Sequence, residues 1–391
     1  MFHRTFLRSS SARSAVAAFL LASGAAYAQN AYVQTNLVSD LSGVAAATDA
    51  NLVNPWGISA SAGSPLWVAN NGTGTSTIYD GLGNPQSLVV TIPPPAGGAG
   101  PAAPTGTVFN STSSFAVGPS APALFLFATE DGTISGWNPG VNSTNAILKV
   151  DNSASGAVYK GLALVVTGSG PMLYATNFHS GMVEVYDGSF NPVNPPGGFF
   201  DWSVPRGYAP FGIQPTPDNN LIVTYALQDA AKHDDVAGSG HGYVDEFDTN
   251  GNLLRRLAAG GALDSPWGIA FAPATGFGQF SGALLIGNFG DGRINAYTLP
   301  NPMSDRDGDF FFGFFQFFGN EARFLDSLRD PNGHPITNLG LWGIRFGNGA
   351  AKGGAVNSLY FTAGIPGSVG TLTTLENHGL FGVLNVQPPT P

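Results

Sequence analysis

The sequence has no cysteine and few charged residues, and each absence excludes a class of protein. Without cysteine there is no disulfide framework and no Cys-ligated zinc or iron–sulfur site. Charged residues make up 10% of the chain, against roughly 25% in ordinary soluble domains. However, 43% of the residues are hydrophobic and 12% are aromatic, so the chain can bury a large core and disorder is excluded. The 54 glycines, with Val and Phe placed between turn residues, favour many short strands and an all-β fold.

Signatures of several enzyme classes are also missing. The chain has no Gly-x-Ser-x-Gly elbow, no His-Glu-x-x-His pair and no phosphate-binding P-loop. It also has no Gly-x-Gly-x-x-Gly between a strand and a helix. These absences argue against serine hydrolysis through a nucleophile elbow, zinc proteolysis and nucleotide chemistry.

The N-terminus has the pattern of a signal peptide. Three arginines precede the apolar stretch Ala15–Ala22, and Ala26-Tyr27-Ala28 fits the small-x-small rule for cleavage after Ala28. The apolar stretch is too short for a transmembrane anchor, which needs about 20 residues. We therefore expect residues 1–28 to be removed on export to the periplasm or the extracellular space, with no membrane anchor.

The remaining chain is strongly acidic. The formal net charge of the whole sequence is −10, and the segment 1–28 carries three arginines and no acidic residue. A polyanion would be repelled by such a surface, so we expect no nucleic-acid partner.

Internal repeats decide the expected fold. A glycine before an apolar strand recurs at roughly 50-residue steps, with a longer last step. Each unit continues with a second apolar run such as Leu66-Trp67-Val68-Ala69-Asn70 and a third alternating run that often ends in Asp-Gly or Asn-Gly. The six glycines are Gly57, Gly106, Gly161, Gly212, Gly268 and Gly343.

Six units of this length, each with room for four short antiparallel strands, predict a six-bladed β-propeller. The sixth unit ends after its third strand, whereas Tyr32–Asp40 is a strand without a partner of its own. We expect this N-terminal strand to pair with the last blade and close the ring, because closure removes an exposed edge. The predicted domain spans residues 29–384, followed by a proline-rich tail at 385–391.

The motifs also carry a resemblance. Pro-Trp-Gly-Ile, then Leu-Trp-Val-Ala-Asn, then a Tyr-Asp-Gly strand resembles the NHL-repeat propellers. Over roughly residues 34–384, the chain looks more closely like a family of uncharacterised exported bacterial propeller proteins. The motifs that carry it are Asn54-Pro55-Trp56-Gly57-Ile58, Ala128-Thr129-Glu130-Asp131-Gly132, Val158-Tyr159-Lys160-Gly161-Leu162-Ala163, Gly287-Asn288-Phe289-Gly290-Asp291-Gly292 and Leu341-Trp342-Gly343-Ile344. Some members carry a C-terminal sorting tag that this chain lacks. The resemblance implies the fold and export, and no established activity.

One face of the ring should collect polar side chains from equivalent loops. The loops after the second strands carry Asn70, Glu130, Asn177, His179 and Asn288. Oxygen ligands around a channel suit Ca²⁺, and the related propeller lactonases use a Glu-Asn-Asn-Asp set. Glu130, Asn177, Asp229 and Asn288 are therefore the candidate metal ligands. The alternative is that these asparagines hold their own loops in shape.

The aromatic residues of the repeat allow two interpretations. Trp56, Trp267 and Trp342 lie at one repeat position, where flat rings could stack on a bound ligand. Recurrence at one position favours packing between blades instead.

The loop of residues 228–242 departs furthest from the repeat. It contains Asp229, His233 and His241 among other polar residues. Such residues can bind a metal or act as acid and base, and His233 and His241 are the weak catalytic candidates. A solvated insertion is the alternative.

Two functions remain open on the sequence. The favoured one is an exported binding or scaffold module whose loop face binds a small molecule, a glycan or an extracellular protein. The alternative is a Ca²⁺-dependent hydrolase of the lactonase or esterase type, with a cation as Lewis acid and a histidine as base.

Overall fold

The computed structural model describes residues 31–299, 321–367 and 375–387. The expected signal peptide and the phenylalanine-rich run Phe310–Phe318 therefore lie outside the described residues, as does the end of the expected tail. Within those ranges, no helix has both the length and the apolar character needed to cross a membrane.

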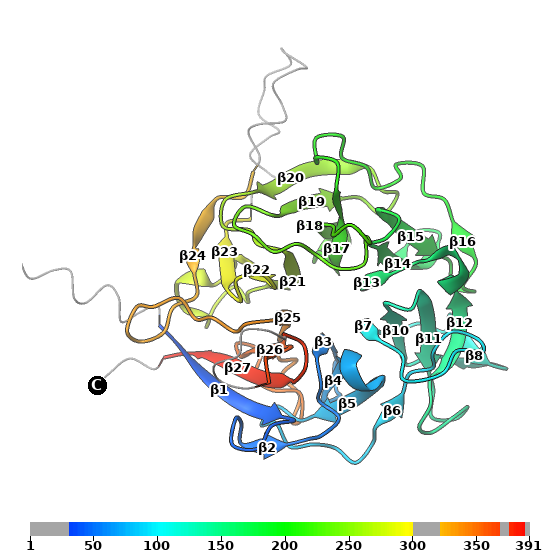
Figure 1. The fold of residues 1–391 in the computed structure, drawn as a ribbon, viewed down its shortest axis with the longest axis horizontal. Coiled ribbons are helices and arrows are strands. Elements are labelled where there is room, and N and C mark those ends of the chain that lie inside the picture. Colours follow the sequence, from blue (N-terminus) through cyan, green and yellow to red (C-terminus); the bar gives the residue numbers. More distant parts are fainter. Residues whose placement is uncertain (1–30, 300–320, 368–374, 388–391) are drawn as a thin grey trace, which may run out of the picture.

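The chain forms a ring of six antiparallel blades around a central axis (Figure 1), as the repeats predict. Blade 1 contains β3 (Pro55–Ser59), β4 (Leu66–Asn70), β5 (Thr75–Tyr79) and β6 (Val90–Thr91). Blade 2 contains β7 (Pro104–Phe109), β10 (Phe125–Thr129), β11 (Thr133–Trp137) and β12 (Ile147–Asp151). Blade 3 contains β13 (Tyr159–Thr167), β14 (Gly170–Asn177), β15 (Met182–Tyr186) and β16 (Pro192–Val193).

The second half of the ring repeats this order. Blade 4 contains β17 (Tyr208–Pro215), β18 (Leu221–Leu227), β19 (Tyr243–Phe247) and β20 (Leu253–Ala259). Blade 5 contains β21 (Pro266–Phe271), β22 (Leu284–Asn288), β23 (Ile294–Tyr297) and β24 (Phe324–Ser327). Within the described residues, the other elements outside blade 6 are a small hairpin, β8 (Ala116–Gly118) with β9 (Ala121–Pro122), and three 3₁₀ turns at Asn71–Thr73, Ser153–Ser155 and Gly278–Phe280.

Blade 6 combines strands from both ends of the chain. Its inner strands are β25 (Leu341–Phe346), β26 (Leu359–Ala363) and β27 (Leu380–Val386), and β1 (Tyr32–Ser39) pairs antiparallel with β27. A short β2 (Ala47–Thr48) adds in parallel to β1. The predicted closure of the ring by the N-terminal strand is confirmed.

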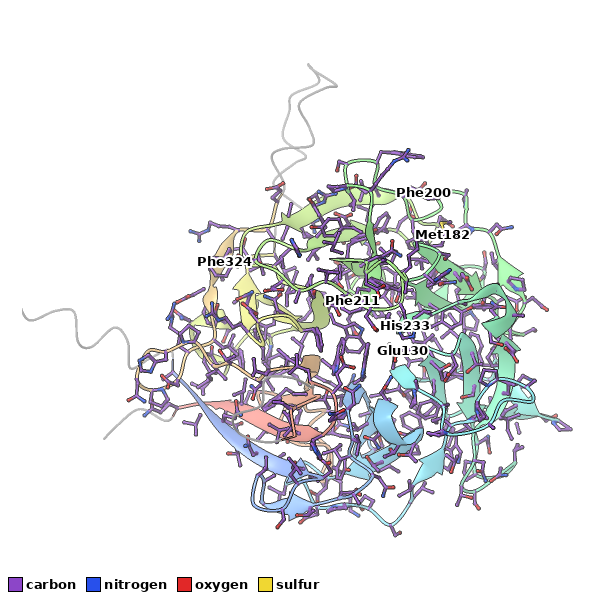
Figure 2. The ribbon with its side chains drawn as sticks, viewed as in Figure 1. Glu130, Met182, Phe200, Phe211, His233 and Phe324 are labelled. Carbon is purple, nitrogen blue, oxygen red and sulfur yellow. The ribbon has the colours of Figure 1, made fainter. Side chains whose placement is uncertain are left out.

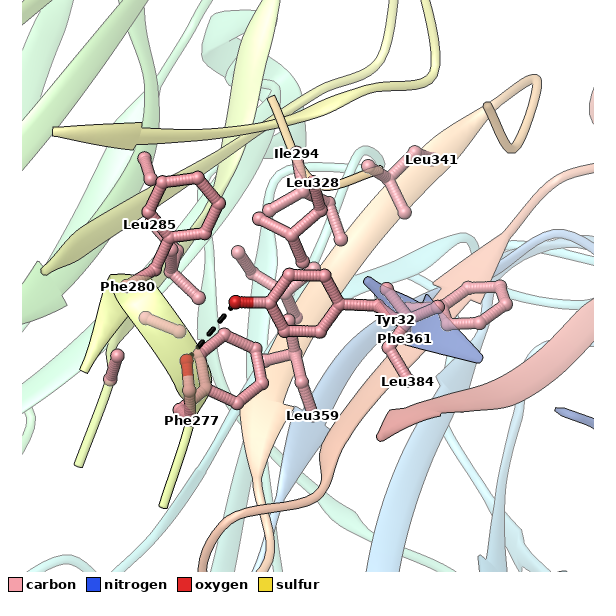
Figure 3. Packing of buried hydrophobic residues seen from close by; sticks show 14 of the residues in the cluster. Tyr32, Phe277, Phe280, Leu285, Ile294, Leu328, Leu341, Leu359, Phe361 and Leu384 are labelled. Atoms are coloured by element: carbon pink, nitrogen blue, oxygen red, sulfur yellow. Dashed lines mark hydrogen bonds between the residues drawn. The ribbon is translucent and has the colours of Figure 1, made fainter. Parts of the chain in front are cut away.

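Tyr32 anchors the closing strand in the core. Its buried ring lies against Phe277 and Phe280 of blade 5, and its hydroxyl donates to the Phe277 carbonyl at 3.0 Å (Figure 3). The hydrogen bond satisfies the one polar atom that this burial would otherwise leave unpaired.

The recurring glycines lie where inner strands of neighbouring blades approach most closely. A Cβ on Gly212 would lie 2.1 Å from the Trp267 carbonyl oxygen, and one on Gly343 would lie 2.5 Å from that of Trp56. Only glycine lets the backbones come this close. The inner strands therefore surround a narrow channel, with a cavity of about 50 Å³ between them.

Candidate functional site

The residues before five of the six recurring glycines lie together and build the floor of the site: Trp56, Lys160, Phe211, Trp267 and Trp342. Trp56 and Trp342 stack with ring centroids 3.3 Å apart, and Trp267 meets Trp56 edge-on at 5.6 Å. All three are at most 8% exposed. These tryptophans lie against one another and close the channel, an arrangement that agrees with the packing interpretation.

Lys160 holds the same position in blade 3 and is the charged member of this set. Its side chain is only 2% exposed, and its ammonium forms an ion pair with Glu130 and lies 3.4 Å from Asp234. The ammonium also lies over the Trp56 ring, 5.2 Å from its centroid. Burial by itself would lower the pKa of Lys160, but the charge and hydrogen bond of Glu130 outweigh it and raise the pKa, so the side chain is a cation.

Glu130 begins a chain of side-chain hydrogen bonds across the loop face. Asn71 donates to its Oε2 at 2.7 Å and also accepts from Asn54 at 3.3 Å. Asn54 in turn donates to Glu376 at 2.8 Å and accepts from the Trp342 indole at 3.0 Å. Burial raises the pKa of Glu376 to about 7, and the charge of Glu130 adds to the effect. The network connects blades 1, 2 and 6 around the aromatic floor.

The long loop of blade 4 covers Lys160 from the outside. His233 Nδ1 lies 2.8 Å from Asp234 Oδ1, and this hydrogen bond lowers the pKa of Asp234 to about 2 and raises that of His233. The Asp234 side chain is 68% exposed, so it presents a carboxylate to solvent. Glu130, His233 and Asp234 bring possible ligand atoms within 4.8 Å of one another. Figure 2 shows Glu130 and His233 side by side near the middle of the ring.

Asp235 places a further, buried carboxyl next to this cluster. Burial raises its pKa to about 6, and its Oδ2 has no hydrogen-bond partner. Together with Glu130, Asp234 and Glu376, it gives the cluster more acidic than basic groups around the single Lys160.

The asparagines at the equivalent strand ends do not join Glu130: these are the predicted metal ligands Asn177 and Asn288, and the predicted ligand-binding residue Asn70. Asn70 donates to Thr77 at 3.0 Å, Asn177 to Glu184 at 2.7 Å, and Asn288 to the Ala262 carbonyl at 2.8 Å. Each amide nitrogen is therefore used within or beside its own blade, whereas the buried Oδ1 atoms of Asn70 and Asn288 have no hydrogen-bond partner. This geometry does not fit the Glu-Asn-Asn-Asp set expected for Ca²⁺, because Lys160 lies against Glu130 instead.

The remaining predicted residues shape the loops. Asp229 accepts the backbone N–H of His233 at 2.9 Å and so fixes the turn that presents His233 and Asp234. His241 Nδ1 lies 2.9 Å from the Val236 carbonyl of the same loop. His179 contacts this loop through its backbone carbonyl, 3.5 Å from the Gln228 amide.

Sequence reasoning missed four members of the cluster, Lys160, Asn54, Asn71 and Glu376, and it identified Asp234 and Asp235 only as carboxylates of the long loop. A signal existed for one of the four. Of the six residues that precede the recurring glycines, Lys160 alone is charged, whereas four are aromatic and one is threonine. A charged residue at a position that the repeat fills with buried rings indicates a local role beyond packing.

Comparison with known proteins finds relatives without assigned activities. The uncharacterised protein R648 of Acanthamoeba polyphaga mimivirus is 33% identical over 352 residues, covering 86% of this chain and 78% of R648. The uncharacterised protein L690 of the same virus is 33% identical over 275 residues, covering 67% of this chain and 70% of L690. A search of family models finds no match.

Solved structures agree with the fold. The soluble aldose sugar dehydrogenase of Escherichia coli in its apo form is 12% identical, with a TM-score of 0.51 over 91% of this chain and 100% of that one. The virginiamycin B lyase of Staphylococcus aureus is 12% identical, with a TM-score of 0.47 over 90% of this chain and 98% of that one, a similarity too weak to bear on the fold. At these identities the likeness concerns the propeller fold alone.

Proposed function

The chain belongs to the same propeller family as the mimivirus proteins R648 and L690, and we propose that it is a binding module whose loop face holds a small, positively charged ligand. The proposed site is the cluster of Glu130, Lys160, His233 and Asp234, with the carboxyls of Asp235 and Glu376 beside it. The observation that carries the proposal is the buried Lys160 ammonium placed beneath an excess of carboxylates.

The charge balance selects the ligand class. Lys160 pairs with Glu130, and His233 is hydrogen-bonded to Asp234, which stays ionised and open to solvent. The acidic excess comes from the additional carboxyls of Asp235 and Glu376, and it favours a cation that can donate hydrogen bonds, such as a primary amine. The narrow channel and the tryptophan floor leave the mouth of the ring as the place for such a ligand.

Calorimetric titration with a primary diamine such as putrescine tests this assignment, and Ca²⁺ is the control cation that donates no hydrogen bond. We expect the wild type to bind putrescine more tightly than Ca²⁺, and Glu130→Gln to bind putrescine at least about tenfold more weakly, because the substitution removes one charge and keeps the shape. Glu321→Gln removes the same charge at an exposed position of blade 5 and should bind like the wild type.

Two outcomes contradict the proposal. One is a wild type that does not bind putrescine, or that binds Ca²⁺ more tightly. The other is Glu130→Gln with unchanged affinity for putrescine. Melting curves of all three proteins separate lost binding from lost folding.

A second candidate function follows from the His233–Asp234 pair. The contact at Nδ1 leaves Nε2 of His233 to exchange a proton with a substrate, as in an ester or lactone hydrolase. Assays of p-nitrophenyl acetate and γ-butyrolactone hydrolysis should then show activity that His233→Ala abolishes. His334→Ala, which removes an exposed histidine elsewhere, should leave that activity unchanged.

Export completes the proposal. The arginines, the apolar stretch and the Ala26-Tyr27-Ala28 site support removal of residues 1–28. Expression of the full chain in a Gram-negative host, followed by intact-mass measurement of the periplasmic fraction, should give a protein that begins at Gln29. A cytoplasmic product of full length would contradict export.

A further inference from the structure

A second candidate site lies on the rim of the ring, between blades 3 and 4. There the segment Phe199–Ser203 alternates between buried and exposed residues. Phe199 is buried against Tyr174 and Phe247. Its neighbour Phe200 is 45% exposed and Trp202 is 92% exposed, with their rings stacked 5.5 Å apart at an angle of 18°.

The two exposed rings are held in place from beneath by Asp201, which lies between them in the sequence. Its carboxylate forms a buried ion pair with Arg256 and accepts hydrogen bonds from the N–H and the hydroxyl of Ser203, both at 2.7 Å. Arg256 also pairs with Asp245 and lies over the Tyr243 ring, 4.9 Å from its centroid. Burying several charges is costly unless they are mutually satisfied. The contacts of Asp201 therefore hold the middle of this segment in place, and Phe200 and Trp202 project outward on either side of it.

Phe200 forms one wall of a groove of about 650 Å³ along β15 and β16. Such a volume is within the range of small-ligand sites. Figure 2 shows Phe200 and Met182 near each other at this edge of the ring. The polar residues that line the groove include Asn152, Ser155, Ser180 and Asn194.

The residues that line the groove include one charged side chain, the carboxylate of Glu184. That carboxylate accepts hydrogen bonds from Asn177 at 2.7 Å and Tyr186 at 2.7 Å, and also from Tyr159. The surface that remains for a ligand combines a rigid aromatic face with neutral amide and hydroxyl groups. A charged ligand would lose its hydration here without gaining an ionic partner.

We propose that this groove is a binding site for a neutral carbohydrate. Sugar rings have apolar C–H faces that stack on aromatic side chains, and hydroxyls that pair with neutral amides and hydroxyls. Trp202 is not among the residues that line the groove, but its ring stacks on Phe200 beside it, so the Phe200 ring loses less conformational entropy when a sugar stacks on it. The site is separate from the cluster around Lys160, so either assignment can fail without the other.

The tryptophans provide a direct readout. The chain has six, and Trp56, Trp67, Trp137, Trp267 and Trp342 are all at most 8% exposed. Acrylamide should therefore quench mainly Trp202. We expect at least one of cellohexaose, chitohexaose and maltohexaose to protect the wild-type fluorescence from acrylamide.

Variants assign that protection to the groove. Phe200→Ala should weaken binding of the same hexasaccharide at least about tenfold. Trp202→Ala should abolish retention on the matching insoluble polymer, cellulose, chitin or starch. Leu82→Ala removes an exposed apolar side chain in blade 1 and should behave as the wild type in both assays.

Three results overturn the proposal. The first is a wild type whose fluorescence none of the three sugars protects. The second is equal retention of Trp202→Ala and wild type on the polymer. The third is a dimer in sedimentation that Trp202→Ala converts to a monomer, which would make the aromatic pair an interface between copies of the chain.

Discussion

Replacing Lys160 by methionine tests whether its ammonium neutralises the carboxylates of the site. The substitution keeps most of the buried side chain and removes the charge that lies against Glu130 and near Asp234. The fold should survive, because the Trp56 ring and the neighbouring aromatic residues still surround an apolar side chain of similar length. The free energy of unfolding should nevertheless fall.

The expected loss is about 2–4 kcal/mol. Removing one partner of a buried ion pair costs about 3–5 kcal/mol, because the other charge is left uncompensated. Glu130 is 11% exposed and keeps the hydrogen bond from Asn71 at 2.7 Å, while Asp234 is open to solvent and rehydrates freely. Both features reduce the cost of leaving the carboxylates without Lys160, so the expected loss lies at or below the lower part of the general range of about 3–5 kcal/mol.

A double-mutant cycle measured by urea unfolding at pH 7 checks the reasoning. The variants are Lys160→Met, Glu130→Gln and the pair together. The pair should be more stable than Lys160→Met alone, because it contains no uncompensated buried carboxylate, and the coupling energy should be at least about 1 kcal/mol. A loss below about 0.5 kcal/mol in Lys160→Met, or additive single effects, would refute a buried ion pair at the centre of the ring.

Three further perturbations test the fold and the titrating groups. Tyr32→Ala should lower the free energy of unfolding in urea by about 3–5 kcal/mol, since it removes a buried ring that joins the closing strand to blade 5. A loss below about 1 kcal/mol would show that ring closure does not depend on the Tyr32 side chain. Gly212→Val should lower the free energy of unfolding by at least about 3 kcal/mol, because its Cβ would meet the Trp267 carbonyl. Gly168→Val is the matched control, because a Cβ there meets open space. Equal stability of the two variants would contradict the close approach of the backbones at Gly212. Burial raises the pKa of Glu376 to about 7 from 4.5, so the native state keeps a proton that the unfolded chain has lost, and stability should fall as pH rises from about 4.5 to 7. Glu376→Gln should remove about 1–2 kcal/mol of that decline, and an unchanged pH profile would contradict the assignment.

The sequence by itself determined the architecture. Glycines at roughly regular steps, two or three apolar runs per step and one unpaired N-terminal run were enough to predict six blades and the closing strand. This worked because each blade repeats the same local pattern, and because an unpaired edge has one obvious partner in a closed ring. The apolar position before Gly57, Gly268 and Gly343 was also readable as packing, since a residue that repeats with the fold usually serves the fold.

The candidate site was only partly readable. Glu130 was identified because a carboxylate replaces asparagine at one of several equivalent strand ends, and it does lie in the central cluster. His233 was named in the long loop and lies beside it. The equivalent residues Asn70, Asn177 and Asn288 were expected near Glu130, yet each amide nitrogen donates to an acceptor next to its own strand.

Tertiary structure alone decided which polar groups meet. The contact of Lys160 with Glu130 joins two blades, the contact with Asp234 adds a loop from a third, and Glu376 reaches the network from the last blade through Asn54. The position of a residue within the repeat predicts which strand of a blade it belongs to. The strand in turn determines how far the residue lies from the axis of the propeller. It does not specify which neighbour a side chain faces, because that depends on loop paths between blades and on which charge must be neutralised once it is buried.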